Sequence, residues 1–92
     1  MIKVKLTKYK ILEEDIFTPD HYKMLSIVQE MKQWCRDSFG PGYDKNTKKW
    51  HWRSTMVYED IDEYDFYNTY MQFPVFYFTS EEKATWFLIR WG

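Results

Sequence analysis

The sequence has few of the residues that cross-link or punctuate a chain: one cysteine, three glycines and three prolines among 92 residues. The single cysteine, Cys35, excludes an internal disulfide framework and fits a reducing compartment. No apolar run reaches the roughly 18 residues of a membrane span, and the first ten residues alternate charged with apolar side chains. The formal net charge of −1 supplies no overall polycation for nucleic acid or membrane. We therefore expect a soluble, cytoplasmic protein without a membrane partner, in which any phosphate contact is local.

Aromatic side chains, in contrast, are abundant. They make up 22% of the chain, and hydrophobic residues make up 45%. This composition excludes a disordered chain and demands that many large rings be buried. A chain of this length forms one domain, residues 1–92, with a thin core that self-association would help to complete.

Three segments have the pattern of β-strands. Residues 2–7 alternate apolar and polar side chains, and the alternation breaks near Thr7 and Lys8, which indicates a bulge or the end of the strand. Residues 50–58 alternate in the same way, and residues 66–78 are apolar or aromatic at most positions. Pro74 has no N–H to donate, so it marks an edge strand or a bulge in the third segment.

Two segments have the pattern of helices. Thr18 is the predicted N-cap of the first, Pro19 its first residue and Gly40 its C-cap, and its apolar face comprises Met24, Ile27, Val28, Met31, Trp34 and Cys35. The second follows a predicted capping box of Thr79 and Glu82, with apolar residues at 84, 87, 88 and 91. An alternative is that residues 88–92 leave this helix as a short strand.

The order β-α-β-β-α predicts an α+β, ferredoxin-like two-layer sandwich, in which two helices cover one face of an antiparallel sheet and the fourth strand is missing or very short. The third strand is apolar on both faces, so we expect a second copy of the chain to cover the open face. The predicted interface of this homodimer comprises Trp50, Trp52, Phe73, Val75 and Tyr77. The alternation does not decide which face of residues 50–58 meets the helices.

An alternative is a surface for single-stranded nucleic acid. In this interpretation Trp50 and Trp52 stack on bases, and basic residues nearby contact phosphates. The residues assigned to this surface are Lys48, Lys49, Trp52 and Arg53. RNA-recognition motifs stack bases on the sheet of the same fold class, but their glycine-aromatic signature is absent, and the acidic residues 59–65 would repel phosphate. Burial of the rings in a core or dimer interface is therefore favoured.

Catalysis is disfavoured. Cys35 would need His21 or His51 as a base, but it lies on the apolar side of a helix, in its second half, where a buried thiol is expected. The spacing of the two histidines and the cysteine matches no metal template, and the acidic residues 59–65 lack the glycine of a calcium-binding EF-hand loop. We predict no catalytic residue, metal ligand or cofactor.

Three segments, "WCRDSFGPG", "KWHWR" and "FYFTSEEKATWFLIRWG", carry a resemblance. Residues 34–92 resemble small uncharacterised proteins of marine phages and viral metagenomes, with a departure at Ile89, where those proteins have a polar residue. The resemblance implies a phage origin and an accessory role in the host cytoplasm, and it implies no site residues. Taken together, the patterns favour a homodimeric, non-catalytic binding or regulatory module.

Overall fold

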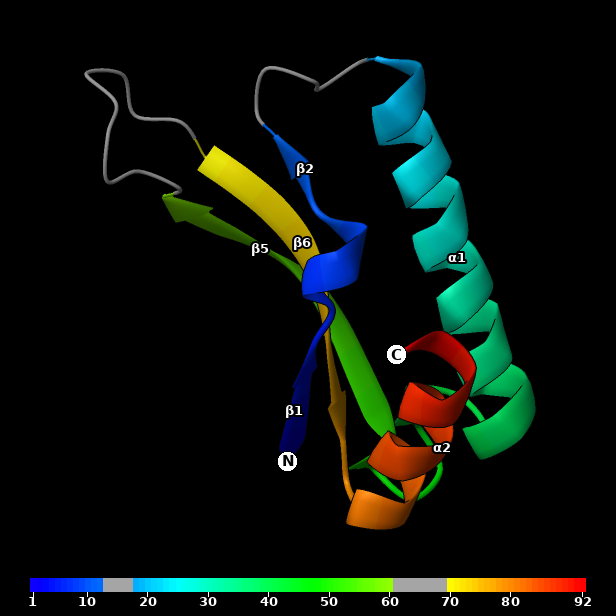
Figure 1. The fold of residues 1–92 in the computed structure, drawn as a ribbon. Coiled ribbons are helices and arrows are strands. Elements are labelled where there is room, and N and C mark those ends of the chain that lie inside the picture. Colours follow the sequence, from blue (N-terminus) through cyan, green and yellow to red (C-terminus); the bar gives the residue numbers. More distant parts are fainter. Residues whose placement is uncertain (13–17, 61–69) are drawn as a thin grey trace.

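The computed structural model describes residues 1–12, 18–60 and 70–92 and has an α+β fold, with a small antiparallel sheet and two helices (Figure 1). A 3-10 turn, η1 (Thr7–Tyr9), interrupts the first strand region. The helices are α1 (Pro19–Phe39) and α2 (Glu81–Trp91). The strands are β1 (Ile2–Lys5), β2 (Ile11–Leu12), β3 (Tyr43–Asp44), β4 (Lys49–Trp50), β5 (Trp52–Asp60) and β6 (Tyr70–Phe78).

The central strand of the main sheet is β6. It pairs antiparallel with β5 along its whole length, from Trp52 opposite Phe78 to Asp60 opposite Tyr70. Its other edge is shared by β1 and β2, which pair with residues 75–78 and 71–72 respectively. The interruption predicted near Thr7 and Lys8 is confirmed, because η1 separates these two strands.

Pro74 lies in the central strand, so its predicted placement on an edge strand or bulge is wrong. Its carbonyl oxygen accepts from the N–H of Leu6, at 3.1 Å. The N–H and C=O of a strand residue point to the same side, so the N–H that Pro74 lacks would also point toward Leu6. Leu6 lies between the end of β1 and the start of η1, so the proline removes no hydrogen bond from the β1–β6 ladder.

The predicted caps of α1 are confirmed. The Thr18 side chain accepts from the N–H of His21, Pro19 is the first helical residue, and Gly40 ends the helix at a φ of 87° while donating its N–H to Arg36. A positive φ of this size is a conformation that glycine adopts without strain.

The N-cap of α2 differs from the prediction. Ser80, rather than Thr79, accepts from the N–H of Lys83, because the helix begins one residue later than the capping-box pattern suggests. The helix continues through Trp91, so the predicted helix is confirmed and the alternative of a short strand over residues 88–92 is wrong.

Both helices pack on the same face of the sheet and enclose the main core (Figure 1). This core contains Trp52 from β5, which settles the face of that strand left open by its alternation. The buried core residues are Val4, Leu6, Met31, Cys35, Trp52, Phe76, Phe78, Ala84, Phe87 and Trp91. Within the described part of the chain, neither helix combines the length and apolar character that crossing a membrane requires.

The opposite face of the sheet is covered by side chains of the same chain. Phe73 and Val75 are buried there, at 1% and 0% exposure. The ammonium group of Lys5 lies 4.6 Å from the centre of the Phe73 ring and pairs with the carboxylate of Glu59, so the pair spans β6 from one edge to the other. The apolar strip on β6 therefore does not by itself require a second copy as cover.

Candidate functional site

The two tryptophans of "KWHWR" belong to different strands. Trp50 ends β4, in a separate two-stranded hairpin with β3, whereas Trp52 begins β5 of the main sheet. The prediction of one continuous strand over residues 50–58 is therefore wrong at its start. The side chain of Trp50 is 49% exposed, and that of Trp52 is 6% exposed.

In the β3–β4 hairpin, Trp50 lies opposite Tyr43. Their ring centres are 4.9 Å apart, and the rings are tilted by 48°. Tyr43 is 40% exposed, so the pair presents two aromatic surfaces to solvent. Rings that are held together and half-exposed offer a platform on which another flat group can stack.

The hairpin turn is organised by Asp44. Its carboxylate accepts from the N–H groups of Asn46, at 2.9 Å, and Thr47, at 3.4 Å. The bond from the Asn46 N–H, followed by those from Thr47 and the charge of nearby His51, holds the pKa of Asp44 below its ordinary value. Lys48 completes the turn with a φ of 58°.

Hydrogen bonds between the residues that flank the hairpin hold its base against α1 and β5. The N–H of His51 donates to the Gly42 oxygen at 2.8 Å, and the indole Nε1 of Trp52 donates to the Gly40 oxygen at 2.9 Å. A Cβ atom at Gly42 would lie 3.2 Å from the main-chain oxygen of Trp52, which explains the glycine at this close approach.

The residues predicted to bind nucleic acid are therefore divided. Lys48 and Lys49 are exposed on the hairpin beside Trp50. Arg53 is exposed on the open face of the sheet, with its guanidinium 4.6 Å from the centre of the Tyr77 ring. Trp52 packs against Phe76 in the core, so this tryptophan is not placed to stack on a base.

The residues predicted for a dimer interface do not form one surface. Trp50 is on the hairpin and Trp52 is in the core, while Phe73 and Val75 are buried on the open face and Tyr77 is half-buried there. Homodimerisation stays a prediction, and its physical premise, an uncovered apolar face, is weakened.

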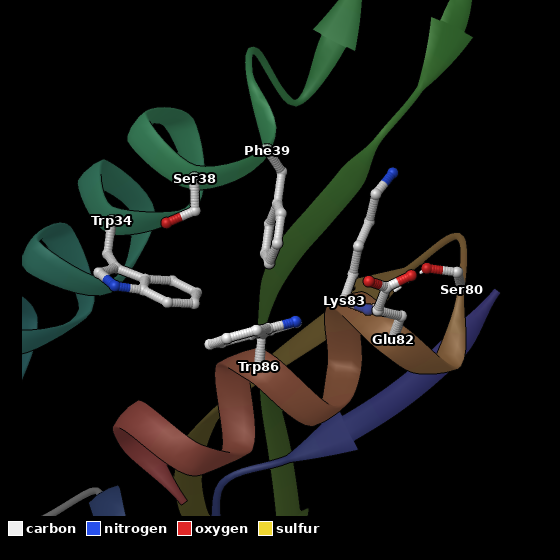
Figure 2. Close-up of a pocket in the computed structure, with 7 residues that line it drawn as sticks. All are labelled: Trp34, Ser38, Phe39, Ser80, Glu82, Lys83 and Trp86. Carbon is white, nitrogen blue, oxygen red and sulfur yellow. Dashed lines mark hydrogen bonds between the residues drawn. The ribbon is translucent and has the colours of Figure 1, made fainter.

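A cleft that the sequence patterns did not reveal lies between the end of α1 and the start of α2 (Figure 2). Its volume is about 380 Å³, and it is lined by Trp34, Ser38, Phe39, Ser80, Glu82, Lys83 and Trp86. Trp34 makes edge contacts with Phe39 and Phe87, with ring centres 5.4 and 6.0 Å apart.

Trp86 forms a wall of this cleft and is 57% exposed. The sequence contains a signal for this residue, because Trp86 lies outside the apolar stripe of α2. An indole at such a position is not buried in the core. Exposed apolar surface at a concave site often marks a binding site.

A chain of hydrogen bonds connects the cleft to the hairpin. The Nζ of Lys83 donates to the Thr79 hydroxyl at 2.9 Å, and this hydroxyl donates to the main-chain oxygen of His51 at 3.4 Å. The cleft and the hairpin therefore lie next to each other at one end of the molecule.

Among the residues that the structure describes, the remaining polar groups do not form a catalytic arrangement. Burial raises the pKa of the Cys35 thiol to about 12, so the thiol is protonated and unreactive, as predicted for a core cysteine. His51 lies 3.8 Å from the carboxylate of Asp44, and His21 stacks on Tyr22 in the first turn of α1. Among the described residues, no three metal-ligating side chains converge. Residues 61–65 of the acidic segment lie outside the described residues.

Comparison with known proteins gives no match: no family model, no curated protein and no solved structure is similar to this chain. The resemblance to phage proteins therefore stays a prediction.

Proposed function

We propose that the protein is a non-catalytic binding module that contacts single-stranded nucleic acid through its β3–β4 hairpin. The observation that carries this proposal is the half-exposed pair of Tyr43 and Trp50, flanked by lysines on the same hairpin. Proteins that bind single strands without strong sequence preference combine aromatic platforms with a basic surface, and each stacked base contributes roughly 1–3 kcal/mol.

The charge of the hairpin supports this partner. Residues 43–50 contain one acidic residue, Asp44, and three lysines, Lys45, Lys48 and Lys49. The carboxylate of Asp44 already accepts hydrogen bonds from the turn, so it is turned toward its own backbone. The local surface is basic although the whole chain carries a net charge of −1, and phosphate attraction falls off over a Debye length of about 8–10 Å.

We further infer that the fold is a ferredoxin-like variant without a fourth strand. In support, β6 lies between β1 and β5 and is antiparallel to both, and the two helices pack on one face. The division of the first edge into β1 and β2, and the inserted hairpin, depart from the simple pattern. In this proposal the inserted hairpin supplies the surface on which bases stack, and Arg53, on the open face of the sheet, supplies a further positive charge.

A binding titration tests this proposal. A fluorescently labelled single-stranded oligonucleotide should bind the protein at low salt and bind more weakly as salt rises, because bound phosphates release counterions. Trp50→Ala should weaken binding roughly 5- to 150-fold, the loss of one stacked base. The matched control is Tyr22→Ala, which removes another exposed aromatic ring, one that lies on α1.

Substitution of the lysines tests the electrostatic contribution to oligonucleotide binding. Replacing both Lys48 and Lys49 by glutamine should reduce the slope of log affinity against log salt by about 1.4, at about 0.7 for each phosphate contact to a single strand. Binding that is insensitive to salt, or that Trp50→Ala and Tyr22→Ala weaken equally, would reject the hairpin as the nucleic-acid surface.

A further inference from the structure

We infer that the cleft between α1 and α2 is a slot for a planar heteroaromatic group, and that its occupant is one unpaired nucleobase of the strand bound by the hairpin. The identity of the occupant rests on the proposed function, whereas the slot itself rests on the geometry of the cleft.

The walls of the cleft suit a flat ring. In Figure 2 the indole of Trp34, from α1, and that of Trp86, from α2, extend toward each other, and the ring of Phe39 points from the end of α1 toward Trp86. Trp34 is held by its edge contacts with Phe39 and Phe87, so this wall is preorganised. Trp86 makes no ring contact in the part of the chain that the structure describes, so its face is available for stacking. The volume of about 380 Å³ lies within the range of roughly 300–1,000 Å³ that is usual for small-molecule sites.

Polar groups at the rim distinguish a heteroaromatic occupant from a purely apolar one. The Ser80 hydroxyl accepts from the N–H of Lys83, which leaves its own hydrogen to donate, and the Glu82 carboxylate accepts only. Ser38 adds a second hydroxyl, which accepts and donates. A nucleobase presents donors and acceptors along one edge, so it matches this mixture of groups.

The position of the cleft links it to the hairpin. Lys83, on its wall, donates to Thr79, and Thr79 donates to the main chain of His51, next to Trp50. A strand stacked on Trp50 and Tyr43 is therefore bound close to the cleft, and we expect another of its bases to enter it.

Nucleosides test the cleft without involving phosphate. Adenosine and uridine should shift the indole N–H resonances of Trp86 and Trp34 in NMR spectra, and their affinity should not change with salt because they carry no charge. Trp86→Ala should reduce nucleoside affinity at least about fivefold, the lower limit for one stacked base. This variant should still fold, because Trp86 lies outside the core.

The two sites are separated by their variants. Trp50→Ala should weaken oligonucleotide binding while the nucleoside-induced shifts of the Trp86 and Trp34 indole resonances persist, and the control Tyr22→Ala, on α1, should leave nucleoside affinity unchanged. An oligonucleotide in which one position lacks its base should lose affinity for the wild-type protein, and it should bind the Trp86→Ala variant as tightly as the intact oligonucleotide does.

Three results would overturn the inference. The first is nucleoside binding that Trp86→Ala does not weaken. The second is no nucleoside binding to the wild type; a change in the assembly state of the Trp86→Ala variant, measured by light scattering, would then show that the cleft is an interface between copies of the chain. Oligonucleotide binding that depends on Trp50 but not on Trp86 would reject the cleft alone and leave the hairpin intact.

Discussion

The indole Nε1 of Trp52 donates a hydrogen bond of 2.9 Å to the main-chain oxygen of Gly40, which joins the first residue of β5 to the turn that ends α1. This bond satisfies the one polar atom of a ring that is otherwise buried against Phe76. Trp50, with only one residue between it and Trp52, lies on another strand and faces solvent. The structure therefore gives the two indoles different roles, one in the core and one at the proposed binding surface.

Trp52→Ala should reduce the free energy of unfolding by about 3–5 kcal/mol, the usual effect of truncating a buried aromatic ring. Trp52→Phe should have a smaller effect, because it keeps a ring but leaves the Gly40 oxygen without its donor. Urea denaturation followed by circular dichroism measures both. Trp50→Ala is the matched control and should change stability by less than about 1 kcal/mol. Equal losses for Trp50→Ala and Trp52→Ala would contradict the placement of these rings.

Ser80→Ala should destabilise the protein by about 1 kcal/mol, since it removes the side-chain cap of α2. Thr79→Ala should have an effect within about 0.5 kcal/mol, because the hydrogen bonds of Thr79 are exposed. Thermal or urea denaturation of the two variants distinguishes them. A larger loss for Thr79→Ala would show that the helix begins one residue earlier.

The thiol of Cys35 should resist modification in the folded protein. Its pKa is raised by burial from 9.0 to about 12, so almost no thiolate is present at pH 8. Because the pKa is raised above its ordinary value of 9.0, the contribution of the protonated thiol to stability is fully present below about pH 9 and is lost as pH rises toward 12. Reaction with a chromogenic disulfide reagent at pH 8 should be slow without denaturant and fast in concentrated urea. A fast reaction of the native protein, at the rate of a small free thiol, would contradict a buried Cys35.

Acid should loosen the hairpin turn. The pKa of Asp44 is lowered in the folded protein, chiefly by the bond from the Asn46 N–H. Its stabilising contribution is therefore present above the unfolded pKa of about 3.9 and is lost as pH falls through the lower folded value. The amide resonances of Asn46 and Thr47 should follow this titration in NMR spectra, and Asp44→Ala should shift the same resonances at neutral pH.

The matched control for this prediction is Asp37→Ala, on α1, where the carboxylate accepts from the side chain of Gln33. This variant should leave the Asn46 and Thr47 resonances unchanged. Resonances that remain constant in acid would show that Asp44 does not organise the turn.

The helices were predictable because their signals are local. Thr18, Pro19 and Gly40 act within one turn of the helix ends, so their effect does not depend on the rest of the fold. The one error, Thr79 in place of Ser80, arose because both residues precede the acidic first turn and either can accept from a helical N–H.

The division of residues 49–60 into two strands was not predictable from alternation. Trp50 and Trp52 are two residues apart. Side chains two residues apart lie on the same face of a sheet only if the strand is continuous. The pairing of β4 with β3, rather than with β6, breaks that continuity at His51. Strand pairing depends on partners distant in sequence, which alternation does not specify.

The sequence by itself determined the ends of α1, the buried state of Cys35, the central apolar segment and the α+β class, because each depends on local propensity or on the amount of apolar surface to be buried. Only the tertiary structure decided which tryptophan faces water, that Lys5, paired with Glu59, covers Phe73, and that Trp34 and Trp86 line one cleft. These relationships join residues far apart in the chain, so they exist only once the helices have packed on the sheet.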